Sequence, residues 1–335
     1  MATMDAVSGL RSFSFDTELN EEEKKLLFLR ARSAGLTFCG CAHAVYLCSL
    51  VHSLRRIIKS HTVNTGKDGD LCVGILGMGH MGKQLLLSIL GMTGIKPSHI
   101  KVSTRTPQSA VESVHSEVEC FCDNRRLAAW ADILFLCCLP SDLPKVSADL
   151  HSHLEKHCLV YSFTSAVPVT RLARLLGHSF ILKPQYDFVP SESADVWLSC
   201  SHVTTALTDP LLIEASSPLE MTGAISLGLN WVCGVLYSLL NICTSASLGS
   251  SDALSLINSL FKEKSTHAVQ LTAESFICSS YASSLLREEP FPWISLSDAQ
   301  TKETPLLCFL SSNKSMQHCI SAAYKSLLET PVKYK

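Results

Sequence analysis

Three glycines carry the clearest chemical signal in this chain: Gly77, Gly79 and Gly82, spaced as G-x-G-x-x-G. The apolar run over residues 71–76 predicts a buried strand before them, and residues 83–90 predict a helix after them. A strand, a glycine turn and a helix in this order bind the phosphates of a dinucleotide. The first glycine permits the tight turn, the second lets a pyrophosphate approach the backbone, and the third lets the helix pack closely on the strand.

The start of the helix strengthens this site, because it offers free N–H groups and the positive end of the helix dipole. We therefore predict that the whole turn contacts the cofactor, and its residues are Gly77, Met78, Gly79, His80, Met81 and Gly82. We expect His80 to line the phosphate site rather than to transfer protons. The alternative is a glycine turn that binds nothing, but the flanking strand and helix favour the phosphate site.

The end of the second predicted strand, at residues 100–103, indicates which dinucleotide is bound. Proteins that prefer NAD place Asp or Glu there, where it binds the ribose hydroxyls. This chain has Ser103, Thr104 and Arg105 instead. Hydroxyls and a guanidinium suit a 2′-phosphate, although an ordinary solvated turn would also carry such residues. The residue types favour NADP as the cofactor.

These residues need a scaffold, and strands alternate with helices from residue 71 to residue 182. The predicted strands are 71–76, 100–103, 117–121, 133–138, 159–163 and 180–182. The predicted helices are 83–90, 107–115, 124–131, 143–154 and 168–176. Such alternation implies an α/β fold with a parallel, Rossmann-type sheet, whose ligands lie beyond the carboxyl ends of the strands. The segments placed on that edge are 77–82, 103–105, 137–140 and 164–166.

The ends of the chain are predicted to be mainly helical. Residues 1–18 show no periodicity and are expected to be disordered. Helices follow at 21–34 and 41–59, separated at Gly35 and Gly40, and a polar linker covers 61–70. The predicted organisation is a short N-terminal helical extension (1–66), an NADP-binding Rossmann domain (67–190) and a mainly helical substrate and dimerisation domain (191–335).

Within the last part, residues 184–220 are expected to form a connection with one strand at 196–198, and residues 288–305 a loop. The further helices are predicted at 252–262, 266–287 and 314–328.

The stretch from Met221 to Ser251 contains no charged residue and is long enough to span a bilayer. Small or polar residues recur on one helical face, however, and no aromatic–basic belt flanks the stretch. The residues on that face are Ser226, Asn230, Gly234, Ser238, Asn241 and Ser245. We therefore expect a buried interdomain or dimer helix, a homo-oligomer through the helical domain, and no membrane contact. A small-residue face also suits packing inside a membrane, so that alternative stays open.

Composition excludes several other classes of function. The 335 residues have a formal net charge of −2 and no Lys/Arg-rich stripe, so we expect no nucleic-acid partner. The 15 cysteines are scattered, without paired C-x-x-C spacing or a preceding secretory signal. We expect reduced cysteines, no metal site and, because no Arg-rich presequence is present, a cytoplasmic protein.

Four segments resemble the pyrroline-5-carboxylate reductase family, and the likeness covers about residues 71–183. Residues 73–82 are similar to its first strand and glycine turn, and residues 103–105 lie where the family has a Ser-rich strand end for NADP. Residues 132–140 resemble the family's S-D-x-[IV]-[FI]-L-A-V-K-P segment, with Cys137, Cys138 and Leu139 replacing Ala, Val and Lys. Residues 160–167 resemble its V-S-x-A-A-G-V segment.

The resemblance implies hydride transfer from NADPH to a small cyclic imine, which gives proline and therefore implies a role in proline biosynthesis. It also implies further cofactor contacts, at Asn124, Cys137, Cys138, Pro140, Thr164, Ser165 and Ala166. The family's substrate loops differ here: residues 183–186 read Lys-Pro-Gln-Tyr, residues 227–231 read Leu-Gly-Leu-Asn-Trp, and no later Ser-Pro-Gly-Gly-Thr-Thr loop is found.

Two hypotheses follow from these departures. The chain is either an NADPH-dependent reductase of a small C=N or C=O substrate or a catalytically silent NADP-binding scaffold. The isolated His267, Tyr281 and His318 of the second half are not assigned a catalytic role.

Overall fold

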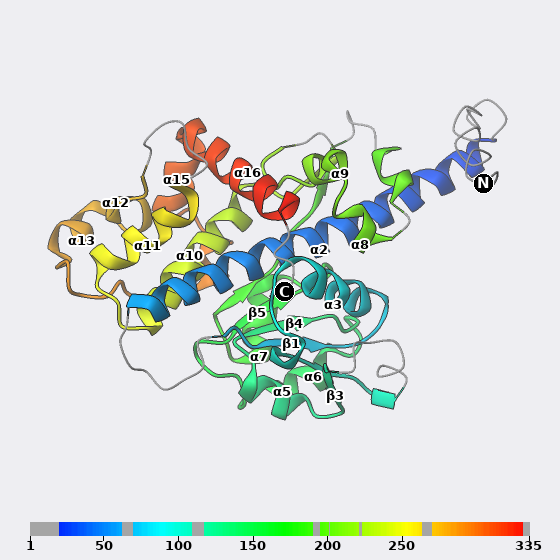
Figure 1. The fold of residues 1–335 in the computed structure, drawn as a ribbon, viewed down its shortest axis with the longest axis horizontal. Helices are drawn as coiled ribbons and strands as arrows, with labels where there is room; N and C mark the ends of the chain where they lie inside the picture. Colours follow the sequence, from blue (N-terminus) through cyan, green and yellow to red (C-terminus); the bar gives the residue numbers. More distant parts are fainter. Residues whose placement is uncertain are drawn as a thin grey trace.

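A six-stranded parallel sheet forms the centre of the part of the chain between residues 73 and 182 (Figure 1). The computed structural model describes residues 20–61, 70–108, 117–189, 195–200, 202–220, 223–262 and 270–330. The strands are β1 (Val73–Leu76), β2 (Ile100–Ser103), β3 (Glu119–Phe121), β4 (Ile133–Leu136), β5 (Leu159–Ser162) and β6 (Ile181–Leu182). Their order is β3-β2-β1-β4-β5-β6, and each adjacent pair is parallel. The predicted Rossmann-type sheet is therefore confirmed.

Helices cover both faces of the sheet, which is why the central strands are apolar throughout. On one face lie α5 (Asn124–Trp130), α6 (Leu143–Leu150) and α7 (Val169–Leu176). The other face is covered by α3 (His80–Met92) and by the N-terminal helix α2 (Glu21–His61). Strand β4 shows the consequence: Ile133 and Phe135 enter the core shared with α2, whereas Leu134 and Leu136 enter the core under α5 to α7.

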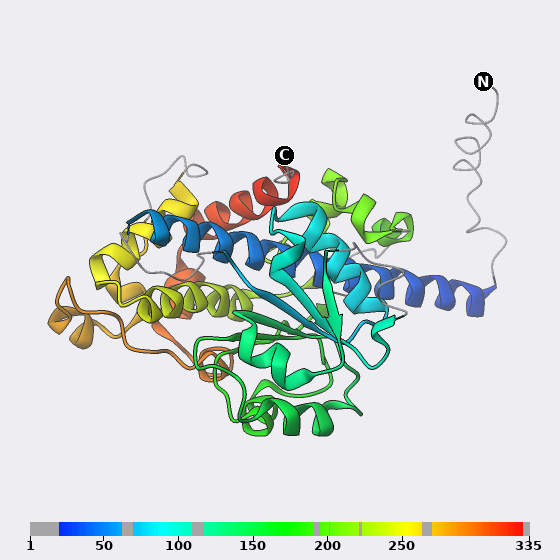
Figure 2. The same ribbon diagram turned by 60° about the horizontal axis from the view of Figure 1, so that its bottom comes forward.

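The N-terminal helix is continuous from Glu21 to His61. The prediction of two separate helices, at 21–34 and 41–59, is therefore wrong. Gly35 and Gly40 do not end a helix; they allow close packing within one. A Cβ on Gly35 would lie 2.7 Å from Cδ1 of Ile225 and 2.8 Å from the ring of Trp197. Every residue from 38 to 51 is buried, because this part of α2 runs between the sheet and the C-terminal helices (Figure 2). The amino-terminal turns of α2 project beyond the rest of the molecule.

The segment after β6 is more structured than the connection predicted for 184–220. It contains β7 (Asp187–Phe188), the 3-10 helix η4 (Asp195–Ser199), α8 (Val203–Ala206) and α9 (Pro210–Ala215). The strand predicted at 196–198 is wrong, because these residues belong to η4. Trp197 of η4 is fully buried against α2, and its indole N–H donates to the carbonyl of Gly223 at 2.7 Å. This tertiary contact outweighs the β propensity of the segment.

The uncharged stretch 221–251 forms a shorter helix than predicted, α10 (Leu229–Ser245), preceded by β8 (Ile225–Ser226), which pairs antiparallel with β7. Gly228 separates the two with a φ of +75°. Three residues of the predicted small and polar face are buried within the same chain: Gly234, Ser238 and Asn241. Ser226 lies in β8 instead of the helix, and Asn230 and Ser245 are exposed. A Cβ on Gly234 would lie 2.5 Å from Cδ1 of Leu182, and the Asn241 side chain pairs with both backbone groups of Ile294.

The remaining helices are α11 (Ser250–Lys262), α12 (Ala273–Phe276), α13 (Ser279–Ser284), α14 (Leu296–Ala299), α15 (Pro305–Ser312) and α16 (Lys314–Glu329), and η3 (Pro97–His99) precedes β2. The single helix predicted at 266–287 is wrong in its described part, which contains α12 and α13. The loop predicted at 288–305 includes α14. The sequence analysis missed α15, although Thr304 and Pro305 are a cap and first residue typical of a helix start.

Some predictions fall on residues that are not described. They are the disorder of 1–18, most of the linker at 61–70 and most of the helix at 107–115, of which only 107 and 108 are described.

One described helix, over Lys25–Ser60 of α2, is long and apolar enough to cross a membrane by length and composition alone. Within its most apolar window, 83% is buried inside the structure. The whole run from Trp231 to Asn241 in α10 is likewise buried in a single chain. Core packing therefore accounts for the apolar composition of both helices, and an interface through α10 stays a prediction.

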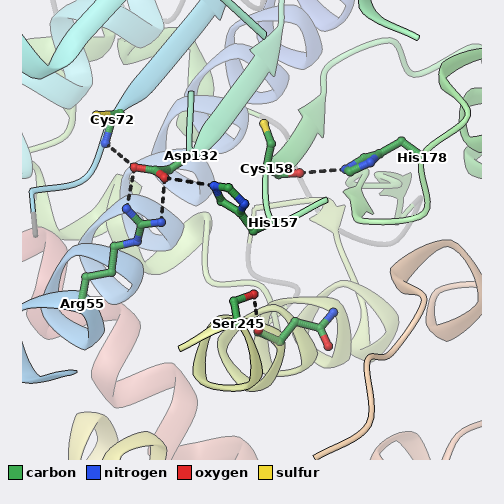
Figure 3. Close-up of polar contacts among 8 residues, drawn as sticks. Arg55, Cys72, Asp132, His157, Cys158, His178 and Ser245 are labelled. Carbon is green, nitrogen blue, oxygen red and sulfur yellow. Dashed lines mark hydrogen bonds and ion pairs between the residues drawn. The ribbon is translucent and has the colours of Figure 1, made fainter. Parts of the chain in front are cut away.

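At the amino end of the sheet, α2 is tied to the residue before β4 (Figure 3). The Arg55 guanidinium donates to both carboxylate oxygens of Asp132, at 2.5 and 2.8 Å. The backbone N–H of Cys72 also donates to Asp132 at 2.9 Å, and Nε2 of His157 lies 3.9 Å away. This cluster lies at the opposite edge of the sheet from the glycine turn.

Candidate functional site

The glycine turn after β1 has a different spatial requirement at each glycine. Gly77 has a φ of +100°, and its N–H donates to the carbonyl of Ser103 at 2.9 Å. A Cβ on Gly82 would lie 2.0 Å from the carbonyl oxygen of Gly77, so helix and strand touch there. A Cβ on Gly79 would meet nothing within 4 Å. The first and third glycines are thus required by the turn itself, whereas the second faces open space.

That open space lies at the amino end of α3. Gly79 is the residue before the first helical turn, and no side chain caps that turn. The N–H groups at the start of α3 are therefore available to a phosphate, which the dipole of a helix also attracts. His80 is exposed, Met81 is half-buried, and Met78 is directed into the core. The geometry fits a pyrophosphate, which needs backbone donors and a position without a Cβ.

The adenosine of a dinucleotide would bind beside the end of β2, and the side chains there differ in how free they are to contact a ligand. Ser103 is buried, and its hydroxyl donates to Oδ1 of Asn124 at 2.8 Å. The Asn124 amide donates in turn to Asp149 of α6 at 2.9 Å. Arg105 is exposed over 85% of its side chain and lies 3.9 Å from Asp142. Ser103 and Asn124 therefore hold each other, while Arg105 is free to swing towards a ligand.

Thr104 is held in place through its backbone, whose N–H donates to the carbonyl of Phe121 at 2.9 Å.

The two acids of this region, Asp142 and Asp149, were missed by the sequence analysis. No local spacing points to them, because α6 reaches the end of β2 only in the folded sheet.

The residues after β4 and β5 form the other half of the same edge. Cys137 donates from its backbone to the carbonyl of Leu76 at 2.8 Å, which places it directly behind the glycine turn. Burial raises the pKa of the Cys138 thiol to about 11 and that of Cys137 well above its usual value, so both thiols are neutral. Pro140 is exposed beyond them. They can line a cofactor but are not activated nucleophiles.

In the loop after β5, Thr164 is buried and its hydroxyl lies 2.5 Å from that of Ser162. Ser165 and Ala166 are exposed. The structure thus brings all four predicted segments to one edge of the sheet, although their side chains differ in accessibility.

A pocket of about 320 Å³ lies beyond this edge, where the segment after β6 meets the amino ends of α7 and α10. Its lining residues are Pro168, Val169, Thr170, Lys183, Gln185, Asp187, Leu227, Gly228, Leu229, Asn230, Trp231, Gln300 and Thr301. Two segments that depart from the reductase pattern, 183–186 and 227–231, therefore meet at one cavity. Sequence reasoning did not assign Lys183 or Gln300 to a site, because their proximity depends on the fold.

Lys183 is fixed at its backbone, since its N–H donates to Oε1 of Gln300 at 2.9 Å. The Gln300 amide donates to the carbonyls of Ile181 at 2.7 Å and of Leu296 at 2.8 Å, so α14 is fastened to β6. Burial lowers the pKa of the Lys183 ammonium.

A buried histidine supports the wall of this pocket from α2. Nε2 of His43 lies 2.8 Å from the carbonyl of Ser216, and Nδ1 lies 2.9 Å from the Tyr186 hydroxyl. Because a carbonyl only accepts, Nε2 carries the proton and the Tyr186 hydroxyl donates to Nδ1. Burial lowers the pKa of His43 to about 4, so the ring is neutral at neutral pH. The His43 ring also packs at 4.9 Å from that of Trp231, a lining residue.

Metal ligation has no candidate among the described residues, where no group of three or more His, Cys, Asp or Glu side chains gathers. All fifteen cysteines lie in the described part, and each is a free thiol.

Known proteins resemble this chain to different extents. Residues 72–165 match the family described as "NADP oxidoreductase coenzyme F420-dependent". NADP-dependent oxidoreductase domain-containing protein 1 of Mus musculus is 38% identical over 340 residues, which cover 96% of this chain and 93% of that protein. Pyrroline-5-carboxylate reductase of Escherichia coli is 32% identical over 108 residues, 32% of this chain and 40% of that enzyme.

Among solved structures, a pyrroline-5-carboxylate reductase from Coxiella burnetii aligns with a TM-score of 0.30 and 16% identity, over 57% of this chain and 77% of that one.

Proposed function

Since the chain belongs to the family of NADP-dependent oxidoreductase domain-containing protein 1, we propose that it is a reductase that transfers hydride from NADPH to a small molecule with a C=N or C=O bond. The likeness of its nucleotide-binding half to pyrroline-5-carboxylate reductase supports this class of reaction. The observation that carries the proposal is the open space at Gly79, bounded by a turn that tolerates no side chain at Gly77 or Gly82.

The cofactor is NADP, and the residues present fit it. The uncapped start of α3 supplies hydrogen-bond donors for the pyrophosphate. Arg105 follows β2, beside whose end the adenosine ribose binds in this fold. Bound NADPH supplies the hydride. The chain's own residues bind the cofactor, orient it across the carboxyl edge of the sheet and hold the substrate beside it.

The pocket at Lys183 supports a substrate site beside the nicotinamide. The adenosine half of a dinucleotide lies over β2, so the other half extends across β1 towards β4 and β5. The pocket lies on that side, between the start of α7, which follows β5, and the segment after β6. A volume of about 320 Å³ suits a small molecule rather than a polymer.

NADPH oxidation, followed by its absorbance, tests the proposal with the purified full chain. The probes are two cyclic imines, 1-pyrroline-5-carboxylate and 1-piperideine, and two carbonyl compounds, pyruvate and 2-oxobutyrate. Turnover with any of them supports the reductase. NADPH binding without turnover across a wider panel of imines and carbonyls would favour the silent NADP-binding scaffold, and no NADPH binding would refute the cofactor site itself.

We further propose that the protein acts in the cytoplasm and assembles as a homo-oligomer through its helical part. Because α10 is buried within one chain, the interface would use exposed apolar side chains such as Leu211 and Leu286. Analytical ultracentrifugation of the full chain tests the assembly, and a monomer at micromolar concentration would contradict it.

A further inference from the structure

We propose that Lys183 is the proton donor of this pocket, and that the pocket is built to reduce a carbonyl group rather than a protonated imine. This inference rests on the proposed function, because it assumes that NADPH is bound at the glycine turn. It adds the substrate class and a catalytic residue that the resemblance to pyrroline-5-carboxylate reductase does not supply.

The position of Lys183 suits a role in the pocket rather than a purely structural role. Lys183 directly follows β6, its backbone is fixed by Gln300, and it is one of the residues that line the cavity. Burial lowers the pKa of its ammonium group, and Asp187 lines the same pocket. A lysine that is half-buried in this way gives up its proton more readily than one in water.

Two helix ends add to the positive potential around Lys183. Helix α7 begins at Val169 and α10 begins at Leu229, and no side chain caps either start. Residues from both first turns line the pocket. The cavity therefore faces the positive ends of two helix dipoles together with one ammonium group. Asp187, which is exposed on β7, is the opposing charge among the lining residues.

This potential distinguishes the two substrate classes. An imine accepts hydride in its protonated form, which is a cation and is repelled by Lys183 and by the two helix ends. A carbonyl group is neutral, and its oxygen becomes negative as hydride reaches the carbon. Preorganised positive groups stabilise that developing charge. The same groups that oppose an iminium ion therefore favour a carbonyl substrate.

The balance of the step assigns the proton to Lys183. The carbonyl carbon gains a hydride, hence two electrons, from bound NADPH, and a C–H bond forms while the carbon–oxygen π bond breaks. The Lys183 ammonium gives one proton to the oxygen, so an O–H bond forms and an alcohol results. The neutral amine of Lys183 then regains a proton from water. The sum is NADPH, a proton and a carbonyl compound giving NADP and an alcohol.

The sequence around Lys183 is consistent with changed chemistry at this position. By the resemblance to the reductases, residues 183–186 stand where that family has an Asn-Thr-Pro-like segment, and residues 227–231 stand near its substrate loop. Both segments line the same cavity. The pocket is thus altered on two sides at once, whereas the glycine turn is kept.

The experiment compares wild type with Lys183→Met and Lys183→Arg, using pyruvate and 2-oxobutyrate against 1-pyrroline-5-carboxylate and 1-piperideine. We expect wild type to favour the carbonyl compounds. Lys183→Met should lower kcat for them by about 100-fold, the size typical of a lost general acid, and leave the Kd for NADPH unchanged. Lys183→Arg keeps the charge but donates a proton poorly, so its kcat should also fall.

Lys59→Met, at the exposed end of α2 and far from the pocket, is the matched control and should behave as wild type. An unchanged NADPH Kd shows that each variant is folded.

Results contrary to these expectations would distinguish failure of this inference from failure of the proposed function. Reduction of imines but not carbonyls, or wild-type kcat in either Lys183 variant, would overturn this inference and leave the reductase intact. Absence of NADPH oxidation with every compound would overturn the proposed function, and the inference with it.

Discussion

The guanidinium of Arg55 in α2 forms a two-pronged ion pair with the carboxylate of Asp132 at the start of β4 (Figure 3). The two residues are 77 positions apart in sequence. Their contact, together with the buried run of α2, makes the N-terminal helix part of the core around the sheet. Removal of α2 would expose the apolar face that β1, β4 and β5 present to it.

Loss of the Arg55–Asp132 pair should destabilise the fold. The Arg55 and Asp132 side chains are 23% and 16% exposed, so Arg55→Ala leaves a mostly buried carboxylate with the Cys72 N–H and the more distant His157 but without the guanidinium. We expect the free energy of unfolding to fall by about 2–4 kcal/mol, measured by urea denaturation. The neighbouring Arg56 is exposed, so Arg56→Ala is the control and should cost little. Equal stability of the two variants would contradict a structural role for the pair.

Two substitutions in the glycine turn should have different effects, one on NADPH binding and the other on folding stability. Gly79→Val adds a side chain to open space, so the variant should fold but lose NADPH affinity by on the order of 100-fold, because the pyrophosphate is displaced. Gly82→Ala places a Cβ against the carbonyl of Gly77 and should lower stability by about 1–3 kcal/mol. Thermal unfolding and NADPH titration of both variants decide this. Tight NADPH binding by Gly79→Val would mean that the cofactor binds elsewhere.

Arg105 should carry much of the preference for NADPH over NADH. Its exposed guanidinium can form a charge-assisted pair with the 2′-phosphate, which NADH lacks. Loss of such a contact costs on the order of 1.5–3 kcal/mol, so Arg105→Ala should weaken NADPH binding roughly ten- to a hundred-fold and leave NADH nearly unchanged. Arg174→Ala, in the last turn of α7, is the control. An equal loss for both cofactors would show that Arg105 does not read the phosphate.

Acid should destabilise the protein through His43. The unfolded chain binds a proton at this residue below about pH 6.5, whereas the folded protein does so only near pH 4. Between these values the unfolded state holds more protons, so stability falls as the pH falls, by about 2 kcal/mol at pH 5 relative to pH 8. Urea denaturation across this range should show a shallower pH dependence for His43→Gln. An unchanged slope would contradict a neutral, buried His43.

The amino-acid sequence alone is enough to predict the nucleotide-binding unit. The run from residue 71 to residue 90 contains its own strand, turn and helix signals within twenty positions, so local sterics and patterning suffice to predict it. The parallel sheet followed in the same way, because each strand is a short apolar run bounded by turn residues. Observed strand ends differ by a few residues, as at β4, where the predicted 133–138 ends at Leu136.

The way in which distant segments meet depends on tertiary packing. Gly35 and Gly40 have the composition of helix breaks, but packing of Trp197, Ile225 and Phe163 against them keeps α2 continuous. His43, Tyr186 and Ser216 form one hydrogen-bonded group across more than 140 positions. Lys183 and Leu227, which are also distant in sequence, line one cavity. Such contacts depend on which buried faces pack together, and no spacing along the chain encodes that choice.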